Sequence, residues 1–115
     1  MHIGETLDVW SPQDFAIWLD AHGATAREIW VVIYKKASGK QSVTYQQLVE
    51  VALCYGWIDG LAKGVDDEKY AQRFSPRRPK SNWTETNKAI ARRLIAEGRM
   101  TEAGRAALPP DVVRS

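Results

Sequence analysis

The sequence predicts an α+β domain in which a small, mainly antiparallel sheet of about three strands packs with three to four helices. Apolar residues recur at helical spacing in several segments, each with a capping residue before it and a glycine after it. Between these segments lie β-branched and aromatic runs that are too short for typical helices. The predicted order is α-β-α-β-β-α-α. The 115 residues form a single domain, 1–115, with residues 1–10 and 109–115 expected to fray.

The first helix and the first strand follow from local rules. Ser11 can accept a hydrogen bond from an amide of the first turn, and Pro12 suits the first helical position, so a helix is predicted from Pro12 to the stop at Gly23. Residues 28–36, EIWVVIYKK, are almost continuously apolar until the final lysines. This run predicts a strand that is buried on both faces near the centre of the sheet.

A second helix and a hairpin come next. Thr44 and Gln47 have the spacing of a capping box, and the helix they begin is expected to stop at Gly56. Residues 57–60 and 70–74 each have the composition of a short strand, and the turn-rich residues between them favour a hairpin with a rather long loop.

The C-terminal part of the chain is predicted to be helical. The prolines of the preceding segment are expected to break any regular element, so Ser81 or Thr84 begins the next helix, which ends at Gly98. Thr101 begins a short last helix, and residues 109–115 are expected to fray.

Residues 72–83, QRFSPRRPKSNW, form a stretch with arginines, a lysine and prolines between aromatic residues, and they contain no acid. Proline restricts its own backbone and that of the preceding residue, so the segment is partly ordered before any ligand binds. Guanidinium groups suit carboxylate or phosphate, and an adjacent helix start offers unpaired amides. The predicted ligand-binding residues are Arg73, Arg77, Arg78, Lys80, Ser81, Asn82 and Trp83.

The hairpin is predicted to support this site. Asp59 follows Trp57 and precedes Gly60, which leaves room for a ligand or a tight turn, and a half-buried carboxylate there needs a cationic partner such as Arg73. The same charges are open to a structural interpretation, in which the arginines pair with internal acids or are simply solvated. Trp83 is open to two interpretations as well, as core or as a stacking surface.

Catalytic signals are weak. Cys54 lies on or beside the apolar stripe of its helix, which predicts an inert core thiol. His2 and His22 have no partner at metal-ligand or nucleophile spacing, so no catalytic residue, metal site or cofactor is predicted. With 16 basic and 14 acidic residues, the net charge of +2 does not identify a partner. An acid–base site at Asp59 and Arg73, and weak nucleic-acid binding by the basic stretch, remain alternatives.

Three blocks of the sequence resemble a known family. They are ALCYGWIDG at 52–60, QRFSPRRPKSNWT at 72–84 and RLIAEGRMTEAG at 93–104. In this order and spacing they are similar to the YdeI/OmpD-associated family, whose members are often labelled bacteriocin-protection proteins, and the likeness extends from about Phe15 to Leu108. The resemblance implies a link to survival against cationic antimicrobial peptides and, in some members, association with an outer-membrane porin. It implies no defined reaction.

The functional hypothesis combines these observations. We expect a non-catalytic binding or adaptor module that recognises an acidic protein partner or a small anion through the basic stretch. Because the chain begins without a secretory pattern and has no apolar run of membrane-spanning length, a cytoplasmic location is expected. A cationic surface repels a cationic peptide, so any protection against such peptides is expected to be indirect.

Overall fold

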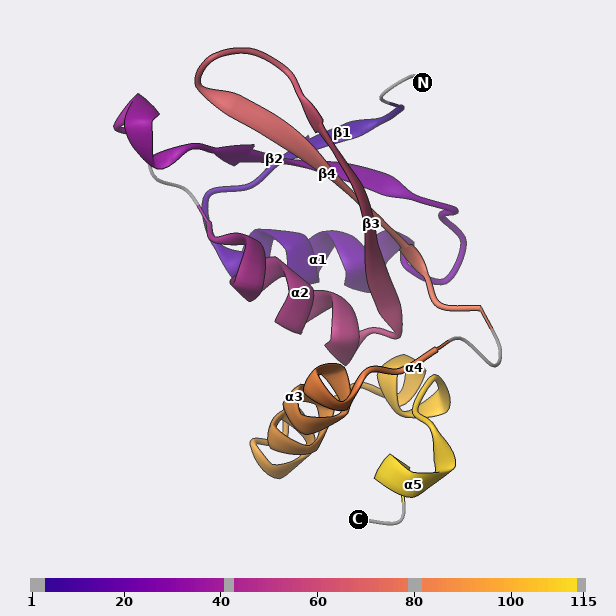
Figure 1. Ribbon diagram of the computed structural model, residues 1–115. Helices are drawn as coiled ribbons and strands as arrows, with labels where there is room; N and C mark the ends of the chain where they lie inside the picture. Colours follow the sequence, from indigo (N-terminus) through magenta and orange to yellow (C-terminus); the bar gives the residue numbers. More distant parts are fainter. Residues whose placement is uncertain (1–3, 41–42, 79–81, 114–115) are drawn as a thin grey trace.

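A computed structural model describes residues 4–40, 43–78 and 82–113, and it confirms the α+β class (Figure 1). The sheet contains four strands, one more than predicted. In chain order the elements are β1 (Thr6–Asp8), α1 (Pro12–His22), β2 (Ile29–Tyr34), a short 3-10 helix η1 (Lys36–Ser38), α2 (Tyr45–Cys54), β3 (Trp57–Gly64), β4 (Lys69–Pro76), α3 (Glu85–Ala96), α4 (Glu102–Ala106) and α5 (Pro110–Val113).

The sheet has the strand order β1-β2-β4-β3, in which β1 is parallel to β2 and the other pairs are antiparallel. Strand β2 lies inside the sheet, and all its residues except Tyr34 are buried, which confirms the prediction for this segment. For the described part of the N-terminal segment, residues 4–10, strand β1 corrects the expectation that residues 1–10 fray. The Trp30 amide donates to the Glu5 carbonyl over 3.0 Å, and Val9 is buried just beyond the strand, so this segment is held by non-local partners.

The β3–β4 hairpin is longer than predicted and contains an irregularity. The register shifts between Asp59 and Ala62, as in a β-bulge. The buried side chain of Gln72 compensates, because its amide nitrogen donates to the carbonyl oxygens of Gly60 and Leu61 over 2.9 and 3.2 Å. Backbone groups left without ladder partners by the bulge are thereby satisfied.

The helix starts follow the predicted caps. Ser11 with Asp14 and Thr44 with Gln47 form capping boxes, and α3 begins after Thr84, whose hydroxyl accepts from the amide of Asn87. Of the two predicted starts of this helix, the structure therefore selects Thr84.

Residues 109–113 correct the expectation that the segment 109–115 frays. Helix α5 covers Pro110–Val113, and Val112 is fully buried. The Asp111 carboxylate lies 3.0 Å from the ammonium group of Lys88 and 3.8 Å from the guanidinium of Arg92, both on α3. Burial and charge together hold α5 against α3.

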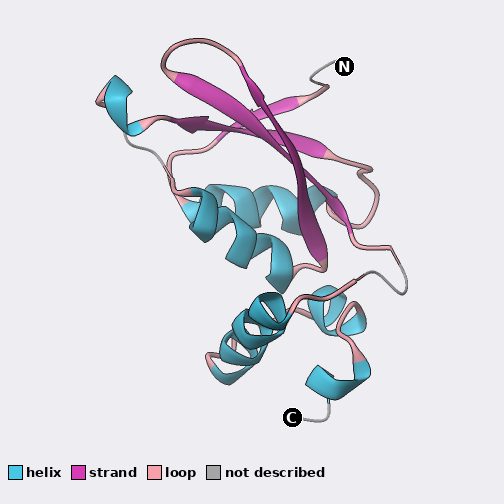
Figure 2. Cartoon of the chain, viewed as in Figure 1, coloured by secondary structure: helices cyan, strands magenta, loops and turns pink. Residues whose placement is uncertain are grey.

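Two layers make up most of the molecule, and a helical cap extends it (Figures 1 and 2). Helices α1 and α2 cover one face of the sheet, where Phe15 of α1 packs against Phe74 of β4 with ring centroids 5.1 Å apart. Helices α3, α4 and α5 gather beyond the C-terminal end of α2. The principal extents are 44 × 25 × 25 Å, so the cap lengthens the domain along one direction.

Candidate functional site

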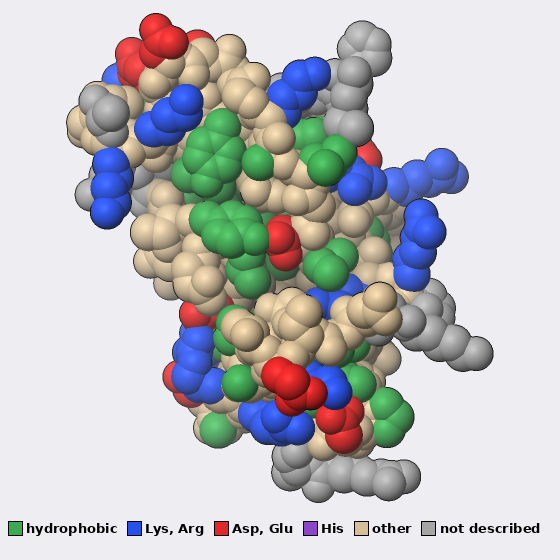
Figure 3. All heavy atoms as spheres, viewed as in Figure 1, with side chains coloured by type: hydrophobic (Ala, Val, Ile, Leu, Met, Phe, Trp, Pro, Cys, Tyr) green, Lys and Arg blue, Asp and Glu red, His purple; other side chains and the backbone are tan. Residues whose placement is uncertain are grey.

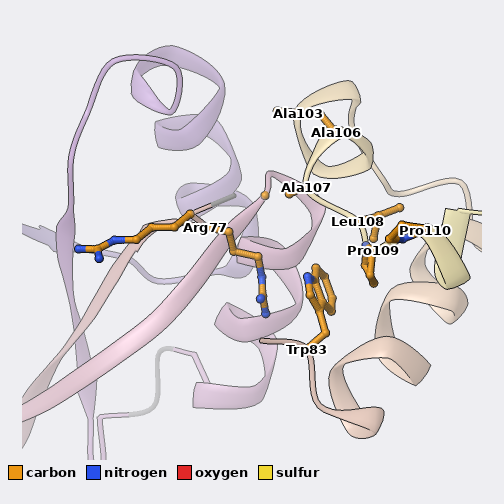
Figure 4. Close-up of a pocket in the computed structure, with 10 residues that line it drawn as sticks. Arg77, Trp83, Ala103, Ala106, Ala107, Leu108, Pro109 and Pro110 are labelled. Atoms are coloured by element: carbon orange, nitrogen blue, oxygen red, sulfur yellow. The ribbon is translucent and has the colours of Figure 1, made fainter. Parts of the chain in front are cut away.

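A cleft of about 650 Å³ lies between the helical cap and the end of β4. It is lined by Gly56 after α2, by Arg77, Arg78 and Trp83 after β4, and by Ala103 and residues 106–110 of α4 and the segment that follows it. Figure 4 shows the Arg77 and Trp83 side chains beside each other, with Leu108 and Pro109 on the opposite side of the ring. Hereafter "the cleft" means this space and these residues.

Backbone contacts fix the floor of the cleft. The Arg77 amide donates to the Gly56 carbonyl over 2.9 Å, which ties the chain after β4 to the turn after α2. Gly56 has φ of 76°, and a β-carbon there would lie 2.8 Å from the carbonyl oxygen of Ala103. A glycine is therefore required both by the turn and by the close approach of α4.

Arg77 and Trp83 form the charged and aromatic wall. The guanidinium carbon of Arg77 lies 3.8 Å from the centroid of the Trp83 ring, and its Nη1 donates to the Asn82 carbonyl over 3.4 Å. Burial lowers the pKa of Arg77, and the nearby Asp59 carboxylate offsets only part of this shift. The cation is thus positioned by a cation–π contact, with the ring covering one face of the guanidinium plane.

Arg78 is the next residue along the chain, and it is exposed and is one of the residues that line the cleft. Within the described ranges of the chain, its side chain makes no ion pair. Its guanidinium group is therefore exposed to solvent, whereas that of Arg77 is directed at Trp83.

Arg73 corrects the predicted site, because its charge is engaged elsewhere. Its Nε lies 2.8 Å from the Glu28 carboxylate, and this hydrogen bond lowers the pKa of Glu28. The Trp30 indole donates to the same carboxylate over 3.2 Å. A β-carbon at Gly60 would lie 3.1 Å from the Arg73 guanidinium, so Gly60 accommodates this pair instead of a ligand.

Asp59 does not orient Arg73 as predicted. Its carboxylate accepts a hydrogen bond from the Tyr45 hydroxyl. Burial, and after it the hydrogen bond to Asp59, raise the pKa of Tyr45 to about 12. Asp59 nevertheless lies near the Arg77 side of the cleft, since Asp59, Arg77 and Asn87 line the same small space.

The remaining predicted residues divide into three groups. Trp57 is 2% exposed and contacts Trp18 edge to face, so it belongs to the core. Asn82 is exposed and contributes its carbonyl oxygen to Arg77. Lys80 and Ser81 lie outside the described residues. The structure thus brings Arg77, Asn82 and Trp83 together, keeps Arg78 among the residues that line the cleft, and pairs Arg73 with Glu28 instead.

Sequence reasoning missed the apolar wall of the cleft, residues 103 and 106–110. The wall is positioned by α4, which docks on the end of α2 through Thr101: the Thr101 amide and hydroxyl both donate to the Cys54 carbonyl. Gly104 is buried at this contact. The blocks at 52–60, 72–84 and 93–104 therefore meet at one place, and each contributes a residue to the cleft. The Pro-Pro pair at 109–110 is the available signal, but by itself it predicts an end to regular structure and not a wall.

The described residues offer neither a cluster of metal ligands nor an exposed thiol. Among the described residues, no group of three or more His, Cys, Asp and Glu side chains is placed to hold a metal ion. Cys54 is buried, and burial raises the pKa of its thiol, which disfavours the reactive thiolate. In the part of the chain that the structure covers, no helix has the length and apolar character needed to cross a membrane.

Residues 7–107 match the family described as Domain of unknown function (DUF8412), and the chain belongs to it. Neither a curated protein nor a solved structure matches the chain. The likeness to the YdeI/OmpD-associated family stays a prediction.

Proposed function

We propose that this protein is a non-catalytic binding module whose cleft takes a ligand that carries a negative charge on an apolar body. One observation supports the proposal above the others: the Arg77–Trp83 pair and the exposed Arg78 line the same cleft as an apolar wall. A guanidinium group binds a carboxylate or phosphate with two parallel hydrogen bonds, and the apolar wall removes water from around that contact.

The broader biological role follows the sequence resemblance. On this proposal the module acts in the cytoplasm, its ligand is a small anion or an acidic group of a protein partner, and any protection against antimicrobial peptides is indirect. The exposed charge of Arg78 at the cleft argues against direct capture of a cationic peptide, because like charges repel. Association with a porin is supported by the sequence resemblance alone.

Nucleic-acid binding is less well supported than binding of a small anion. Arg73 pairs with Glu28 and does not line the cleft, which leaves Arg77 and Arg78 as its described cations. If both contacted phosphates, the slope of log affinity against log salt would be about −2, which implies weak binding at physiological salt. On the face in Figure 3, basic side chains lie scattered around the edge and among acidic ones, without forming a continuous stripe.

An acid–base enzyme at Asp59 and Arg73 is also less well supported. The two side chains have different partners, Tyr45 and Glu28, so the pair that such a mechanism needs is not assembled.

An NMR titration tests the proposed function. The ¹⁵N-labelled protein is titrated with inorganic phosphate, benzoate, an acidic peptide, AMP, single-stranded DNA and a cationic antimicrobial peptide. We expect at least one anion to shift the Trp83 indole resonance and the amides of residues 103 and 106–108. Arg77→Ala should weaken that binding about tenfold, as expected for loss of a charged hydrogen-bond partner.

Arg27→Ala is the matched control, because Arg27 is exposed and does not line the cleft. It removes the same charge and should leave the affinity unchanged. A panel that shifts no resonance of the cleft, or equal losses in both variants, would contradict the proposed function.

A further inference from the structure

Arg77 lines two spaces that have different neighbours. One is the cleft, and the described residues that line it include no acid. The other, hereafter the inner space, has no room for a ligand and is lined by Val49, Leu53, Trp57, Ile58, Asp59, Arg77 and Asn87. Asp59 is the acid among them. Arg77 therefore lies between a site that is open to an anion and a carboxylate of the protein itself.

One face of α2 restrains the Asp59 carboxylate. Tyr45, Val49 and Leu53 are spaced by four residues, so their side chains lie on the same face of this helix. Val49 and Leu53 line the inner space, and the Tyr45 hydroxyl donates a hydrogen bond to Asp59. Because hydrogen bonds are directional, this contact limits how far the carboxylate can turn toward Arg77.

The Arg77 guanidinium is held in place by groups other than Asp59. Its carbon lies 3.8 Å from the centroid of the Trp83 ring, and its Nη1 donates to the Asn82 carbonyl over 3.4 Å. The backbone amide of Arg77 is tied to the Gly56 carbonyl. Asp59 should therefore change the electrostatic potential at the guanidinium more than it changes the position of the group.

An anion that binds at Arg77 is attracted by the guanidinium and repelled by Asp59. The attraction between Asp59 and Arg77 is visible in the pKa of Arg77, which burial lowers and the carboxylate partly restores. The repulsion between Asp59 and a ligand scales with the charge of the ligand, so it doubles for an anion with two charges. Because Arg77 is half-buried, solvent and salt screen this repulsion less than they would at the surface.

We propose that Asp59 is an internal counter-charge that lowers the affinity of the cleft for anions, most strongly for those with two charges. Tyr45 limits this effect because it holds the Asp59 carboxylate. Neither residue lines the cleft, so both act through Arg77. This inference rests on the proposed function and names two residues that set the charge selectivity of the same site.

Isothermal titration calorimetry at about pH 8 tests the inference with benzoate, which carries one charge, and phenyl phosphate, which carries two. Asp59→Asn should raise the affinity for benzoate roughly fivefold and that for phenyl phosphate roughly twenty-five-fold, because the repulsive energy that is removed doubles with the charge. Tyr45→Phe should lower the benzoate affinity about threefold, because Asp59 is then free to turn toward Arg77. In the Asp59→Asn background, Tyr45→Phe should have no effect.

A second tyrosine–aspartate pair provides matched controls. The Tyr55 hydroxyl donates to Asp20 over 2.8 Å, and neither residue lines the cleft or the inner space. Tyr55→Phe and Asp20→Asn remove the same groups and should leave both affinities unchanged. Circular dichroism shows whether each variant is folded. Tyr45 is exposed, so Tyr45→Phe tests the inference even if Asp59→Asn does not fold.

The outcomes separate this inference from the proposed function. If Arg77→Ala weakens binding but Asp59→Asn leaves both affinities unchanged, the counter-charge is overturned and the proposed function stands. Weaker binding by Asp59→Asn would mean that Asp59 orients Arg77, which also overturns the inference alone. Equal gains for benzoate and phenyl phosphate would contradict selection by charge. If neither probe binds the parent protein, both proposals fail.

Discussion

The two sides of helix α4 differ in how closely they are packed. On one side Gly104 is buried, and a β-carbon there would lie less than 3.0 Å from the carbonyl oxygen of Cys54, a separation that real β-carbons essentially never show. On the other side Ala103 and Ala106 are exposed and line the cleft. One five-residue helix thus joins a contact with no spare volume to a surface with room for a ligand.

The difference shows how a short helix can hold a binding wall in place. A helix of this length is not stable by itself, so its position depends on tertiary contacts. Those contacts are made by the packed side, through the Thr101 amide and hydroxyl and the close approach of Gly104 to Cys54, and the side chains that face the cleft take no part in them. Substitutions of the residues that face the cleft are therefore expected to leave α4 in place.

The largest expected effect is that of Gly104→Ala. The added methyl group collides with the Cys54 carbonyl, so α4 must move away from α2, and we expect a loss of about 3 kcal/mol in the free energy of unfolding. Gly64→Ala is the control, because a β-carbon there would meet no atom within 4 Å. Urea denaturation followed by circular dichroism measures both. Equal stabilities of the two variants would contradict the close packing of this side.

A smaller difference in the free energy of unfolding is expected between variants of two helix-capping threonines. Thr84 and Thr101 each accept a hydrogen bond of 3.1 Å from a backbone amide of their helix, but only Thr101 also donates to the Cys54 carbonyl. We expect Thr84→Ala to cost about 1 kcal/mol and Thr101→Ala about 2 kcal/mol of unfolding free energy. Equal losses would show that the contact with Cys54 adds nothing to the docking of α4.

The smallest effect concerns Tyr55, which lies beside the packed side of α4. Burial, and after it the hydrogen bond that its hydroxyl donates to Asp20 over 2.8 Å, raise its pKa to about 12. An unfolded tyrosine ionises near pH 10. The stabilising effect is fully present below pH 10 and is lost as the pH rises toward 12, because the unfolded state releases the proton more readily.

Tyr55→Phe should therefore reduce the fall in unfolding free energy between about pH 10 and 12, relative to the parent protein. Guanidinium denaturation at pH 7, 10 and 11.5 measures this difference in slope. A parallel decline of the parent and the variant would show that Tyr55 does not contribute to it.

Local chemistry made much of the fold predictable. The caps at Ser11, Thr44, Thr84 and Thr101 depend on residues within four positions, and the structure places helices after each of them. Strand β1 was missed because its residues Thr6–Asp8 have no strong pattern of their own and gain order only by pairing with β2. Residues 109–113 were missed for a similar reason, since the burial of Val112 depends on a partner helix far away in the sequence.

The candidate site was predictable only in its charged half. Arg77, Arg78 and Trp83 are close in sequence and chemically conspicuous, so their grouping was visible. The partner of Arg73 was not, because Glu28 lies 45 positions away and reaches it only through the pairing of β2 with β4. The apolar wall consists of alanine, leucine and proline, which carry no chemical signal until the fold brings them opposite a charge.

The ion pairs of Asp111 with Lys88 and Arg92 have a consequence for how ligand binding responds to salt. They restrain α5, whose first residue, Pro110, forms part of the cleft, and exposed ion pairs of this kind are screened at high ionic strength. Added salt therefore acts in two places at once, on the attraction between ligand and arginine and on the rigidity of the opposite wall. The slope of log affinity against log salt will therefore depend on these ion pairs as well as on the number of charges on the ligand. Repeating the salt titration with the Asp111→Asn variant, which lacks the ion pairs, will separate the two contributions.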